Sequence, residues 1–545
     1  MKKLLLITLI LLFACPLALA EKSGLFEYKV QEDDTVMITG CSGKPYSLEV
    51  PAVIDGRSVT AIGPWAFSRR TSLDSIVLPQ GLTSIGEGAF NECSNLDAIN
   101  LPKSVRTIGA KAFAKCRGFT EVILPEGLQF VGDEAFADCI FLKFVALPDS
   151  LQAMGVNPFI RCSALSQISV SPANSHFATI EGVLFCKGEK KLVCYPQGLK
   201  AASYTVPAGI CSIGDKAFEG CPSLSSVSMP ASLSVIGSSA FRDCEGLCEV
   251  TFAEGLTAIG DHAFYHCSSL TAAALPQGLG AIGSHAFQGC HSLASLSLPQ
   301  GLAAIGDSAF YDCQSLTSVI LPQGLITLGT HAFSSCPALA SVTLCDSLET
   351  MGANPFLGCS SLREIYVSAE QPYFMVVDHV LFQKQEQKLL CYPGGLSNAS
   401  YTVPAGTRVI DAQAFYGCAS LTAVTLPEGL FSIEGAAFSK CSGLASITLP
   451  PSLVSIGTSA FSECRALTAV TLPENLASIG DGVFYGCTAL ASLRLPDGLT
   501  SIGENAFKYC KLVLTVSPNS YAHTYAVANK IPFSYPEASL DWLNN

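Results

Sequence analysis

The stretch LPQGLAAIGDSAFYDCQSLTSVIL, residues 298–321, decides the fold of this chain because variants of it return every 23 residues. Its phenylalanine marks each copy. The markers are Phe67, Phe90, Phe113, Phe136, Phe159, Phe218, Phe241, Phe264, Phe287, Phe310, Phe333, Phe356, Phe415, Phe438, Phe461, Phe484 and Phe507. All neighbouring markers are 23 residues apart except two pairs, which are 59 apart. A fixed period of this length is typical of a solenoid, in which each repeat buries its apolar face only against its neighbours.

One copy of the repeat divides into two strand-forming stretches and a corner. Leu316, Val319 and Leu321 are placed so that apolar residues point inward from a strand. Pro322 ends that stretch, because proline has no N–H to donate to a strand ladder. Further apolar residues then begin a second inward set. The pattern predicts an α/β-type repeat solenoid that is mainly β, built from 23-residue coils whose parallel strands stack from copy to copy.

Glycine marks the corner of the repeat. It stands four residues before the marker in fifteen of the seventeen copies, as Gly329 does before Phe333. Such a preference indicates either a positive φ or a close approach of two backbone segments. Asp, Ser or Thr follows the glycine slot in nine copies, Thr330 among them, which favours an N-cap and a short helical turn around Phe333.

The composition fits a long buried core. Only 14% of the residues are charged and the mean hydropathy is +0.40. After the first twenty residues, however, no apolar run approaches the length of a membrane span. The hydrophobic residues recur at regular intervals instead. We therefore expect no membrane span.

The first twenty residues have the features of a secretory signal peptide. Lys2 and Lys3 form a basic start, an apolar stretch follows, and small residues precede Glu21. An alternative is a lipoprotein leader in which Cys15 would carry the lipid. Of 31 basic and 44 acidic side chains, removal of the leader would leave 29 and 44, a net charge of −15. This charge argues against nucleic acid and anionic lipid as partners.

Cysteine is abundant and unevenly placed. The chain has 24 cysteines, and sixteen of them stand three residues after the marker, from Cys93 to Cys510. Equivalent residues of stacked repeats form a column with about 5 Å between neighbours. Side chains that point the same way are poorly placed for disulfide geometry. We therefore predict a column of buried, unbridged thiols. Disulfides and a metal ladder are the alternatives, although no histidine or carboxylate accompanies this slot.

Residues outside the repeat form two ends and two insertions. Residues 24–58 alternate as strands do, which predicts a small sheet that caps the solenoid. Each 59-residue spacing adds 36 residues with two apolar strands around a charged turn, and the two insertions match at an offset of 197 residues. We expect these hairpins to extend the sheet; a protruding binding feature is the alternative. Residues 520–529 favour a closing helix with Tyr521, Tyr525 and Ala528 on one face.

The predicted organisation follows the chain in order. It comprises a signal peptide (1–20), an N-terminal β cap (21–58), a first repeat block (59–170), a β-hairpin insertion (171–202), a second repeat block (203–367), a second β-hairpin insertion (368–399), a third repeat block (400–516) and a C-terminal cap (517–545). Asn-Pro-Phe replaces the usual Xaa-Ala-Phe just before each insertion, at Phe159 and Phe356. The repeat is therefore altered at both places where the array is interrupted.

The consensus Leu-Pro-x-Gly-Leu-x-x-Ile-Gly-x-x-Ala-Phe-x-x-Cys-x-x-Leu-x-x-Val-x-Leu resembles that of bacterial BspA-like leucine-rich repeat proteins. The segment 39–63, the hairpin motifs Gly-Val-Leu-Phe (182–185) and His-Val-Leu-Phe (379–382), and the closing Ser-Tyr-Ala (520–522) are also similar to that family. The resemblance covers nearly all of the chain after residue 20. It implies a right-handed leucine-rich-repeat array with capped ends, and a secreted or surface protein, since some members are implicated in adhesion. The resemblance assigns no binding residue to this chain.

The sequence offers little catalytic chemistry. An enzyme needs titratable side chains that converge in a pocket. The only ordered set is His262, His285 and His331, each two residues before a marker, with Ser308 in the intervening copy. Neighbouring histidines of this kind would form a metal-binding or pH-sensing column. The alternative is a solvent-facing slot of variable residue type, since other copies hold Ser, Glu or Lys. We expect no catalytic site, no cofactor and no metal.

The outward positions of the first strand of each copy are more informative. Among 32 such positions only Glu121, Glu249, Glu364 and Arg494 are charged, and Ser, Thr and Ala are frequent. These positions would form a nearly neutral surface roughly 80 Å long at the spacing of paired strands. Such a surface can meet a partner with little desolvation of charge. The alternative is that these residues only satisfy the preferences of exposed strand positions.

The bulky and charged outward residues form the candidate binding surface. Phe144 and Tyr366 are its predicted aromatic anchors. The full set is Glu121, Ile123, Phe144, Ile320, Glu364 and Tyr366. We predict a non-enzymatic, extracellular or cell-surface binding protein, an adhesin whose partner is a protein of the host matrix or of a bacterial surface, and we leave a homo-oligomer open. The alternative is a structural envelope or surface-layer component without a specific host ligand.

Overall fold

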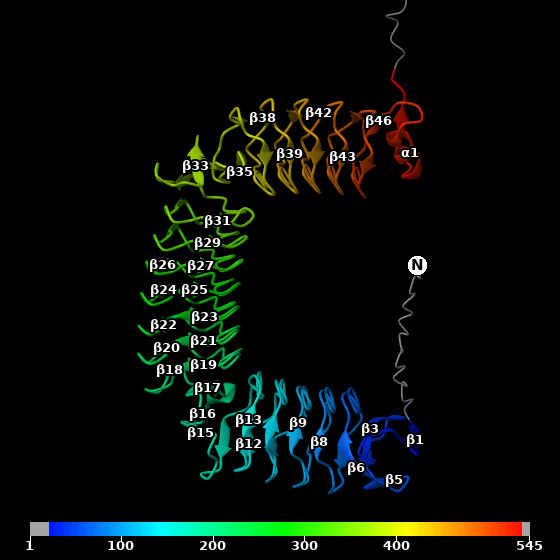
Figure 1. Ribbon diagram of the computed structural model, residues 1–545, viewed down its shortest axis with the longest axis vertical. Coiled ribbons are helices and arrows are strands. Elements are labelled where there is room, and N and C mark those ends of the chain that lie inside the picture. The colour runs from blue at the N-terminus through cyan, green and yellow to red at the C-terminus, as the bar shows by residue number, and fades with distance from the viewer. Residues whose placement is uncertain (1–20, 537–545) are drawn as a thin grey trace, which may run out of the picture. The chain divides into compact units, whose positions relative to one another are not determined.

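The structure, a computed structural model, describes residues 21–536 (Figure 1). The predicted signal peptide, with its alternative lipid site at Cys15, lies outside the described residues, as does the end of the predicted C-terminal cap, residues 537–545. The chain divides into two compact units, Met1–Gly188 with Val193–Leu199 and Glu189–Leu192 with Lys200–Asn545. The boundary falls within the first insertion, and each unit is a run of stacked repeats.

Each repeat forms a rung with three sides. In the rung of Phe333, the first side is the A strand β28 (Ser318–Ile320) and the second is the B strand β29 (Thr327–Leu328). The third side, here called the turn side, holds Phe333 itself. Both strands pair in parallel with the equivalent strands of the next rung, as Ser318 does with Ser341, 23 residues later. The predicted mainly β solenoid with parallel strands is therefore confirmed.

The first unit contains the N-terminal cap and the first rungs. The cap strands are β1 (Glu21–Ser23), β2 (Phe26–Val30), β3 (Val36–Cys41), β4 (Ser47–Glu49), β5 (Val53–Ile54) and β6 (Arg57–Ile62). The A strands are β7 (Ser75–Val77), β10 (Glu121–Ile123), β12 (Phe144–Leu147) and β14 (Gln167–Val170), and the B strands are β8 (Ser84–Ile85), β9 (Thr107–Ile108), β11 (Phe130–Val131) and β13 (Ala153–Met154). Cap strands β3 and β4 pair with β6 and β7, so the predicted cap extends both sheets of the solenoid.

The first insertion contains β15 (Phe177–Ile180), β16 (Val183–Cys186), β17 (Lys191–Cys194) and the 3-10 helix Gln197–Leu199. The next A strands are β18 (Ser203–Thr205), β20 (Ser226–Ser228), β22 (Glu249–Thr251), β24 (Ala272–Ala274), β26 (Ser295–Ser297), β28, β30 (Ser341–Thr343) and β32 (Glu364–Tyr366). The B strands are β19 (Ser212–Ile213), β21 (Val235–Ile236), β23 (Ala258–Ile259), β25 (Ala281–Ile282), β27 (Ala304–Ile305), β29 and β31 (Thr350–Met351).

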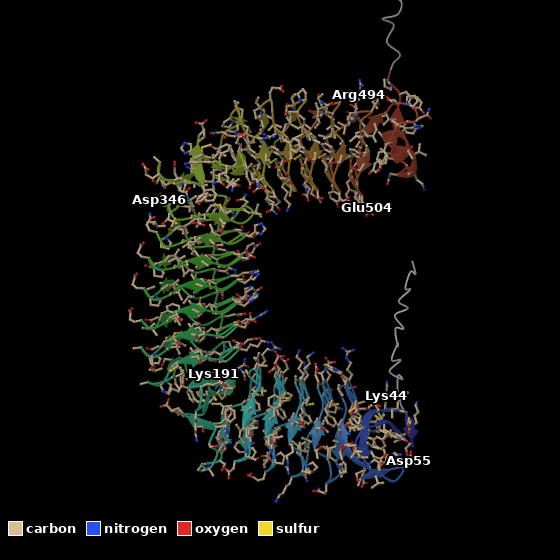
Figure 2. All side chains as sticks on the ribbon, in the orientation of Figure 1. Lys44, Asp55, Lys191, Asp346, Arg494 and Glu504 are labelled. Atoms are coloured by element: carbon tan, nitrogen blue, oxygen red, sulfur yellow. The ribbon has the colours of Figure 1, made fainter. Side chains whose placement is uncertain are left out.

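The second insertion contains β33 (Phe374–Val377), β34 (Val380–Gln383) and β35 (Lys388–Cys391). The A strands that follow are β36 (Ser400–Thr402), β38 (Ala423–Thr425), β40 (Ser446–Thr448), β42 (Ala469–Thr471), β44 (Ser492–Arg494) and β46 (Val513–Thr515), which also pairs with β47 (Phe533–Ser534). The B strands are β37 (Val409–Ile410), β39 (Ser432–Ile433), β41 (Ser455–Ile456), β43 (Ser478–Ile479) and β45 (Ser501–Ile502). Figure 2 shows Arg494, on an A strand, and Glu504, just after a B strand, projecting from opposite edges of this block.

The turn side has a backbone ladder of its own. In the rung of Phe90, alternate residues 88, 90 and 92 donate their N–H groups to carbonyls of the next rung over 2.7–2.8 Å. The residues two before and two after the marker have positive φ, 57° at Gly88 and 63° at Glu92. The expected short helical turn is therefore wrong. Alternating left-handed residues direct the N–H groups toward the next rung, whereas a helix would direct them along the chain.

The corner glycine is required by a close approach of two backbones. A Cβ added at Gly306 would lie 2.6 Å from the nitrogen of Ser284 and 2.8 Å from the carbonyl carbon of Gly283, in the preceding rung. Positive φ occurs two residues later instead. The residue after the glycine caps no helix: Asp261 Oδ1 accepts a hydrogen bond at 2.7 Å from the N–H of Ser284, 23 residues on. This side chain joins two rungs, so the expected N-cap is also wrong.

The marker phenylalanines stack through the core. The rings of Phe264, Phe287 and Phe310 have centroids 5.0 and 5.2 Å apart and lie within 8° of parallel. The 23 cysteines of the described residues are free thiols. In most rungs the column thiol donates to the carbonyl of the preceding marker, as Cys313 Sγ does to Phe287 O at 3.4 Å. The predicted unbridged column is present, and a small apolar side chain with a weak donor suits it.

The first rung lacks the column cysteine, and Arg70 takes its place. The guanidinium of Arg70 donates to the carbonyl of Gly43 at 2.8 Å and to that of Cys41. The slot that elsewhere joins two rungs therefore joins the first rung to the N-terminal cap.

The helix α1 (Tyr521–Ala528) closes the other end, as predicted. Its buried residues are Ala522 and Ala526, whereas Tyr521 and Ala528 are exposed. The predicted face is therefore wrong at these two residues, because alanines let the helix lie closer to the last rung than a tyrosine would. No helix within residues 21–536 is long and apolar enough to cross a membrane.

Each insertion contains three strands where two were expected. In the second insertion, Asp378 and His379 have φ of 48° and 69° and form a two-residue turn between the antiparallel strands β33 and β34. Strand β34 pairs with β35, and β35 pairs in parallel with β37. The insertion therefore extends the B sheet, as expected, and β33 becomes its edge strand.

The second insertion also supplies the first aromatic ring of the next stack in the core. Tyr392 follows β35 and stacks on Phe415 with ring centroids 5.2 Å apart. Its N–H donates to Ala414 O at 2.8 Å, as the N–H of a marker phenylalanine would. Asn354, from the altered Asn-Pro-Phe copy, donates through Nδ2 to Gln413 O at 2.8 Å. This amide joins the two rungs across the 59-residue spacing.

Candidate binding surface

The predicted surface residues of the first unit lie together on one sheet. Strands β10, β12 and β14 pair in parallel, with Glu121 beside Phe144 and Ile123 beside Ala146. The central residue of each strand points into the core, so its two neighbours point outward. Ile123 is 64% exposed. Three of the six predicted residues are therefore close neighbours on β10 and β12.

Phe144 is less accessible than the sequence predicted. It is half-buried, whereas Phe141 in the preceding turn is 56% exposed. Sequence reasoning missed Phe141, although a signal was available. Its slot, five residues after the marker, holds small or polar residues in every other copy before the last. The aromatic side chain on this part of the first unit that a partner would meet first is thus Phe141.

The predicted residues of the second unit lie on β28, β30 and β32. The parallel register places Ile320, Thr343 and Tyr366 in one row, and Glu364 at the end of the row beside it. Ile320 is 73% exposed and Tyr366 is 53% exposed. Two large apolar side chains therefore flank a threonine on an open sheet.

A side-chain contact joins this sheet to the second insertion. His379, in the turn between β33 and β34, has its Nδ1 3.2 Å from Oε2 of Glu364 on β32. The surface around Tyr366 therefore includes the hairpin turn. Sequence reasoning missed His379, because nothing in the local pattern predicts a pair between the end of a repeat block and a turn of the insertion.

The six predicted residues thus form two groups, one in each unit. Glu121, Ile123 and Phe144 belong to the first unit; Ile320, Glu364 and Tyr366 belong to the second. Ile123 and Ile320 are 197 residues apart, the offset of the duplicated segment, so they occupy equivalent positions two rungs before an insertion.

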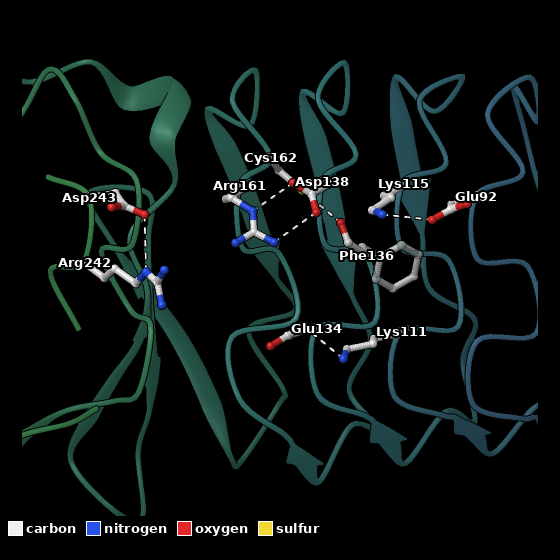
Figure 3. Close-up of polar contacts among 10 residues, drawn as sticks. All are labelled: Glu92, Lys111, Lys115, Glu134, Phe136, Asp138, Arg161, Cys162, Arg242 and Asp243. Carbon is white, nitrogen blue, oxygen red and sulfur yellow. Dashed lines mark hydrogen bonds and ion pairs between the residues drawn. The ribbon is translucent and has the colours of Figure 1, made fainter. Parts of the chain in front are cut away.

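The turn side of the first unit carries charges of alternating sign. The residues two after the marker are Arg69, Glu92, Lys115, Asp138 and Arg161. Glu92 contacts Arg69 at 3.2 Å. Figure 3 shows the contacts of Glu92 with Lys115, at 2.9 Å, and of Arg161 with Asp138, at 2.8 Å. Exposed pairs of this kind contribute little to stability. These five side chains are therefore paired with one another.

The turn side of the second unit carries the histidine column. His262 and His285 stack with ring centroids 4.7 Å apart and an interplanar angle of 18°. His331 Nε2 lies 2.6 Å from Oε1 of Gln413. Within residues 21–536, no group of three histidine, cysteine or acidic side chains has the geometry to hold a metal ion. His262 and His285 are therefore neighbours, as the 23-residue spacing predicts, and their rings stack.

A cleft of about 310 Å³ lies beside the edge strand β33. Met375, Val377 and Phe382 form one side and residues 404–407 the other. Its lining otherwise offers two glutamine amides and the amine of Lys384. These groups do not include the paired acid and base that proton-transfer chemistry needs.

The model of the BspA type leucine-rich repeat region matches residues 52–187, 194–303, 280–376 and 395–528. The chain belongs to the BspA-type leucine-rich repeat family. The resemblance predicted from the repeat consensus is therefore confirmed, and the matched segments include both blocks that surround the second insertion.

Solved structures similar to this BspA-type protein include three from bacteria. A leucine-rich cell surface protein of Faecalibacterium prausnitzii is 20% identical, with 96% of each chain covered and a TM-score of 0.44. The pneumococcal vaccine antigen PcpA is 23% identical over 66% of this chain and 96% of its own, with a TM-score of 0.49. A leucine-rich repeat protein of Bacteroides ovatus is 22% identical over 95% and 100%, with a TM-score of 0.36. A search of the curated proteins found no match.

Proposed function

We propose that this BspA-type protein is an extracellular, non-enzymatic adhesin that binds a protein of the host matrix or of a bacterial surface through its A-strand faces. The observation that supports this most directly is the row Ile320, Thr343 and Tyr366. Two large apolar side chains are 73% and 53% exposed there, on a sheet with little charge. Exposed aromatic and apolar residues on a rigid, weakly charged face are the usual anchors of a protein interface.

Export would follow from the leader-like first twenty residues, with the mature chain beginning at Glu21. N-terminal sequencing of the protein recovered from the culture medium or cell surface tests this part of the proposal. A chain that begins at Met1 and stays inside the cell would contradict it. Lipid attached at Cys15 would support surface attachment by the alternative leader.

The binding test uses the mature chain and immobilised fibronectin, laminin and collagen, together with whole bacterial cells. We expect saturable binding to at least one of them, and a loss of about tenfold or more in affinity for Ile320→Asp with Tyr366→Asp. Thr425→Asp is the matched control, because Thr425 is an exposed A-strand residue of the same unit, away from this row. Equal affinity of both variants would contradict the assigned surface. Self-association without saturable binding would support a structural envelope component instead.

A further inference from the structure

Five of the eight histidines lie on one turn side of the second unit. They are His262, His266, His285, His291 and His331, in the rungs marked by Phe264, Phe287 and Phe333. Four of them hold the left-handed positions of their rungs, with φ between 55° and 58°. The sequence pattern revealed three of the five. His266 and His291 join this face because residues on both sides of a marker share the turn side.

The rings on this face are packed against each other and against their neighbours. His262 and His285 stack at 4.7 Å, and His262 also lies 5.5 Å from the ring of Tyr265. The guanidinium of Arg242 lies over the same tyrosine ring at 4.8 Å. A Cβ added at Gly289 would lie 2.4 Å from Cδ2 of His266, so the glycine makes room for that ring. The histidines therefore have defined positions before any ligand binds.

Protonation reverses the charge of this face. In the five rungs from Phe241 to Phe333, the other charged turn-side residues are Arg242, Asp243, Glu245, Asp261, Asp307 and Asp312. One arginine against five carboxylates gives −4 when the histidines are neutral, and five protonated histidines bring the face to +1. Histidine is the side chain whose charge changes between neutral and mildly acidic pH.

The carboxylates are largely engaged within the protein, whereas three of the five histidines have no acidic partner among the described residues. Asp243 and Asp312 lie 3.4 and 3.0 Å from His266 and His291. Asp261 and Asp307 each accept a backbone N–H of the next rung at 2.7 Å. By contrast, His285 has its Nδ1 on the Gln288 amide at 2.6 Å, and His262 forms no ion pair among the described residues. The positive charge that acidification adds at His262 and His285 is therefore available to an external anion.

The groups around His262 oppose its protonation in the free protein. Burial, then His285 and Arg242, hold its pKa below the ordinary value, while Asp261 acts in the other direction. Because the folded pKa is lowered, protonation of His262 makes the fold less stable as the pH falls. An anion that bridges the two stacked rings would remove this cost. Anion binding and proton uptake at this face are thus thermodynamically linked.

We propose that the turn side of the rungs from Phe241 to Phe333 is a proton-gated binding surface for an anionic polysaccharide. The rungs are spaced 5.0–5.2 Å apart, so the charges form a line suited to a linear chain that bears carboxylate or sulfate groups at intervals. Half-exposed Tyr265 and Tyr311 add flat apolar surfaces on the same face. Nucleic acid is a poorer fit, because its dense phosphates are normally met by several lysines and arginines, and this face has one arginine.

The test measures binding of the mature chain to dextran sulfate and to uncharged dextran at constant ionic strength. We expect dextran sulfate to bind at least about tenfold more tightly at about pH 5.5 than at about pH 7.5, on either side of the ordinary histidine pKa. His262→Gln with His285→Gln should lose most of this gain and leave the weak binding near pH 7.5 unchanged. His176→Gln with His523→Gln is the control, because both histidines lie outside this face.

A gain-of-function variant keeps the proposal testable if the glutamine variant folds poorly. His262→Lys with His285→Lys should bind dextran sulfate at about pH 7.5 more tightly than the wild type does at that pH, because lysine carries its charge there. Alginate tests carboxylate in place of sulfate, and either anion binding with the expected pH dependence supports the proposal. Binding that is independent of pH, or lost equally in the control, would overturn it. Tighter binding of single-stranded DNA would overturn the assignment to a polysaccharide.

Discussion

A single methyl group at the corner of a rung would collide with the rung before it. We predict that Gly306→Ala lowers the free energy of unfolding by about 1–3 kcal/mol, since overpacking a close contact forces the backbone to shift. Gly435→Ala is the matched control. Its new Cβ would meet nothing nearer than 3.5 Å, and its φ is not positive. Urea unfolding followed by circular dichroism compares the two, and equal midpoints would contradict the close-approach explanation.

The cysteines differ in reactivity according to their place in a rung. Burial raises the pKa of Cys244 and of Cys441 to about 12, so little thiolate forms at mildly alkaline pH. Cys248 is exposed. We predict that iodoacetamide labels Cys248 first in the native protein and leaves column thiols such as Cys244 unlabelled until the chain is denatured. Mass spectrometry of the labelled peptides measures this. Rapid native labelling of Cys244 would show that the column is open to solvent.

At the scale of elements, a buried amide contributes to the junction across the second insertion. Asn354 Nδ2 donates to Gln413 O at 2.8 Å, and Asn354 is 5% exposed. We predict that Asn354→Ala costs about 1 kcal/mol, since it removes a buried hydrogen bond. The effect should be local, with faster hydrogen exchange at the Tyr392 amide, which bonds to the neighbouring residue Ala414.

The control for this prediction is Asn475→Ala. Asn475 also donates to a backbone carbonyl, but over 3.4 Å and at the surface. Its loss should leave exchange at the junction unchanged. An Asn354→Ala protein with wild-type exchange at Tyr392 would show that β35 and the restarted stack hold the junction without the amide.

At the scale of the whole molecule, the insertions divide the array into blocks, and a new B sheet begins at each insertion. Buried residues from Val380 to Ala526 form one continuous apolar cluster, and the B sheet from β33 to β45 is self-contained. In a solenoid each rung contacts only its neighbours, so a block with both ends covered needs no other part of the chain. We predict that residues 368–545 fold alone and unfold cooperatively, as circular dichroism with urea would measure.

A shorter fragment, residues 400–545, is the matched control. It lacks β33–β35 and Tyr392, so the ring of Phe415 and the edge of β37 would be exposed to solvent. We expect it to be markedly less stable or to aggregate, as uncapped repeat arrays do. Equal stability of the two fragments would show that the insertion does not act as a cap of the array.

Much of the fold was predictable because the same local pattern of residues recurs every 23 positions. The columns of Leu316, Phe310 and Cys313 need only equivalent residues 23 positions away, so the consensus alone predicts the rung and its stacking. The short helical turn, by contrast, was predicted wrongly. Residues such as Lys111 and His262 adopt positive φ, and side-chain preferences do not reveal a left-handed conformation that is stabilised by hydrogen bonds to the next rung.

The sequence by itself determined the repeat, its parallel strands, its thiol column and the positions of both interruptions, because each follows from spacing along one chain. Only the tertiary structure decided which side chains outside these columns meet. It paired Glu364 with His379, left Phe141 more accessible than Phe144, and brought His266 to the face of His262. These outcomes depend on how rungs and insertions fold back on one another in space, and the periodic pattern carries no information about such contacts.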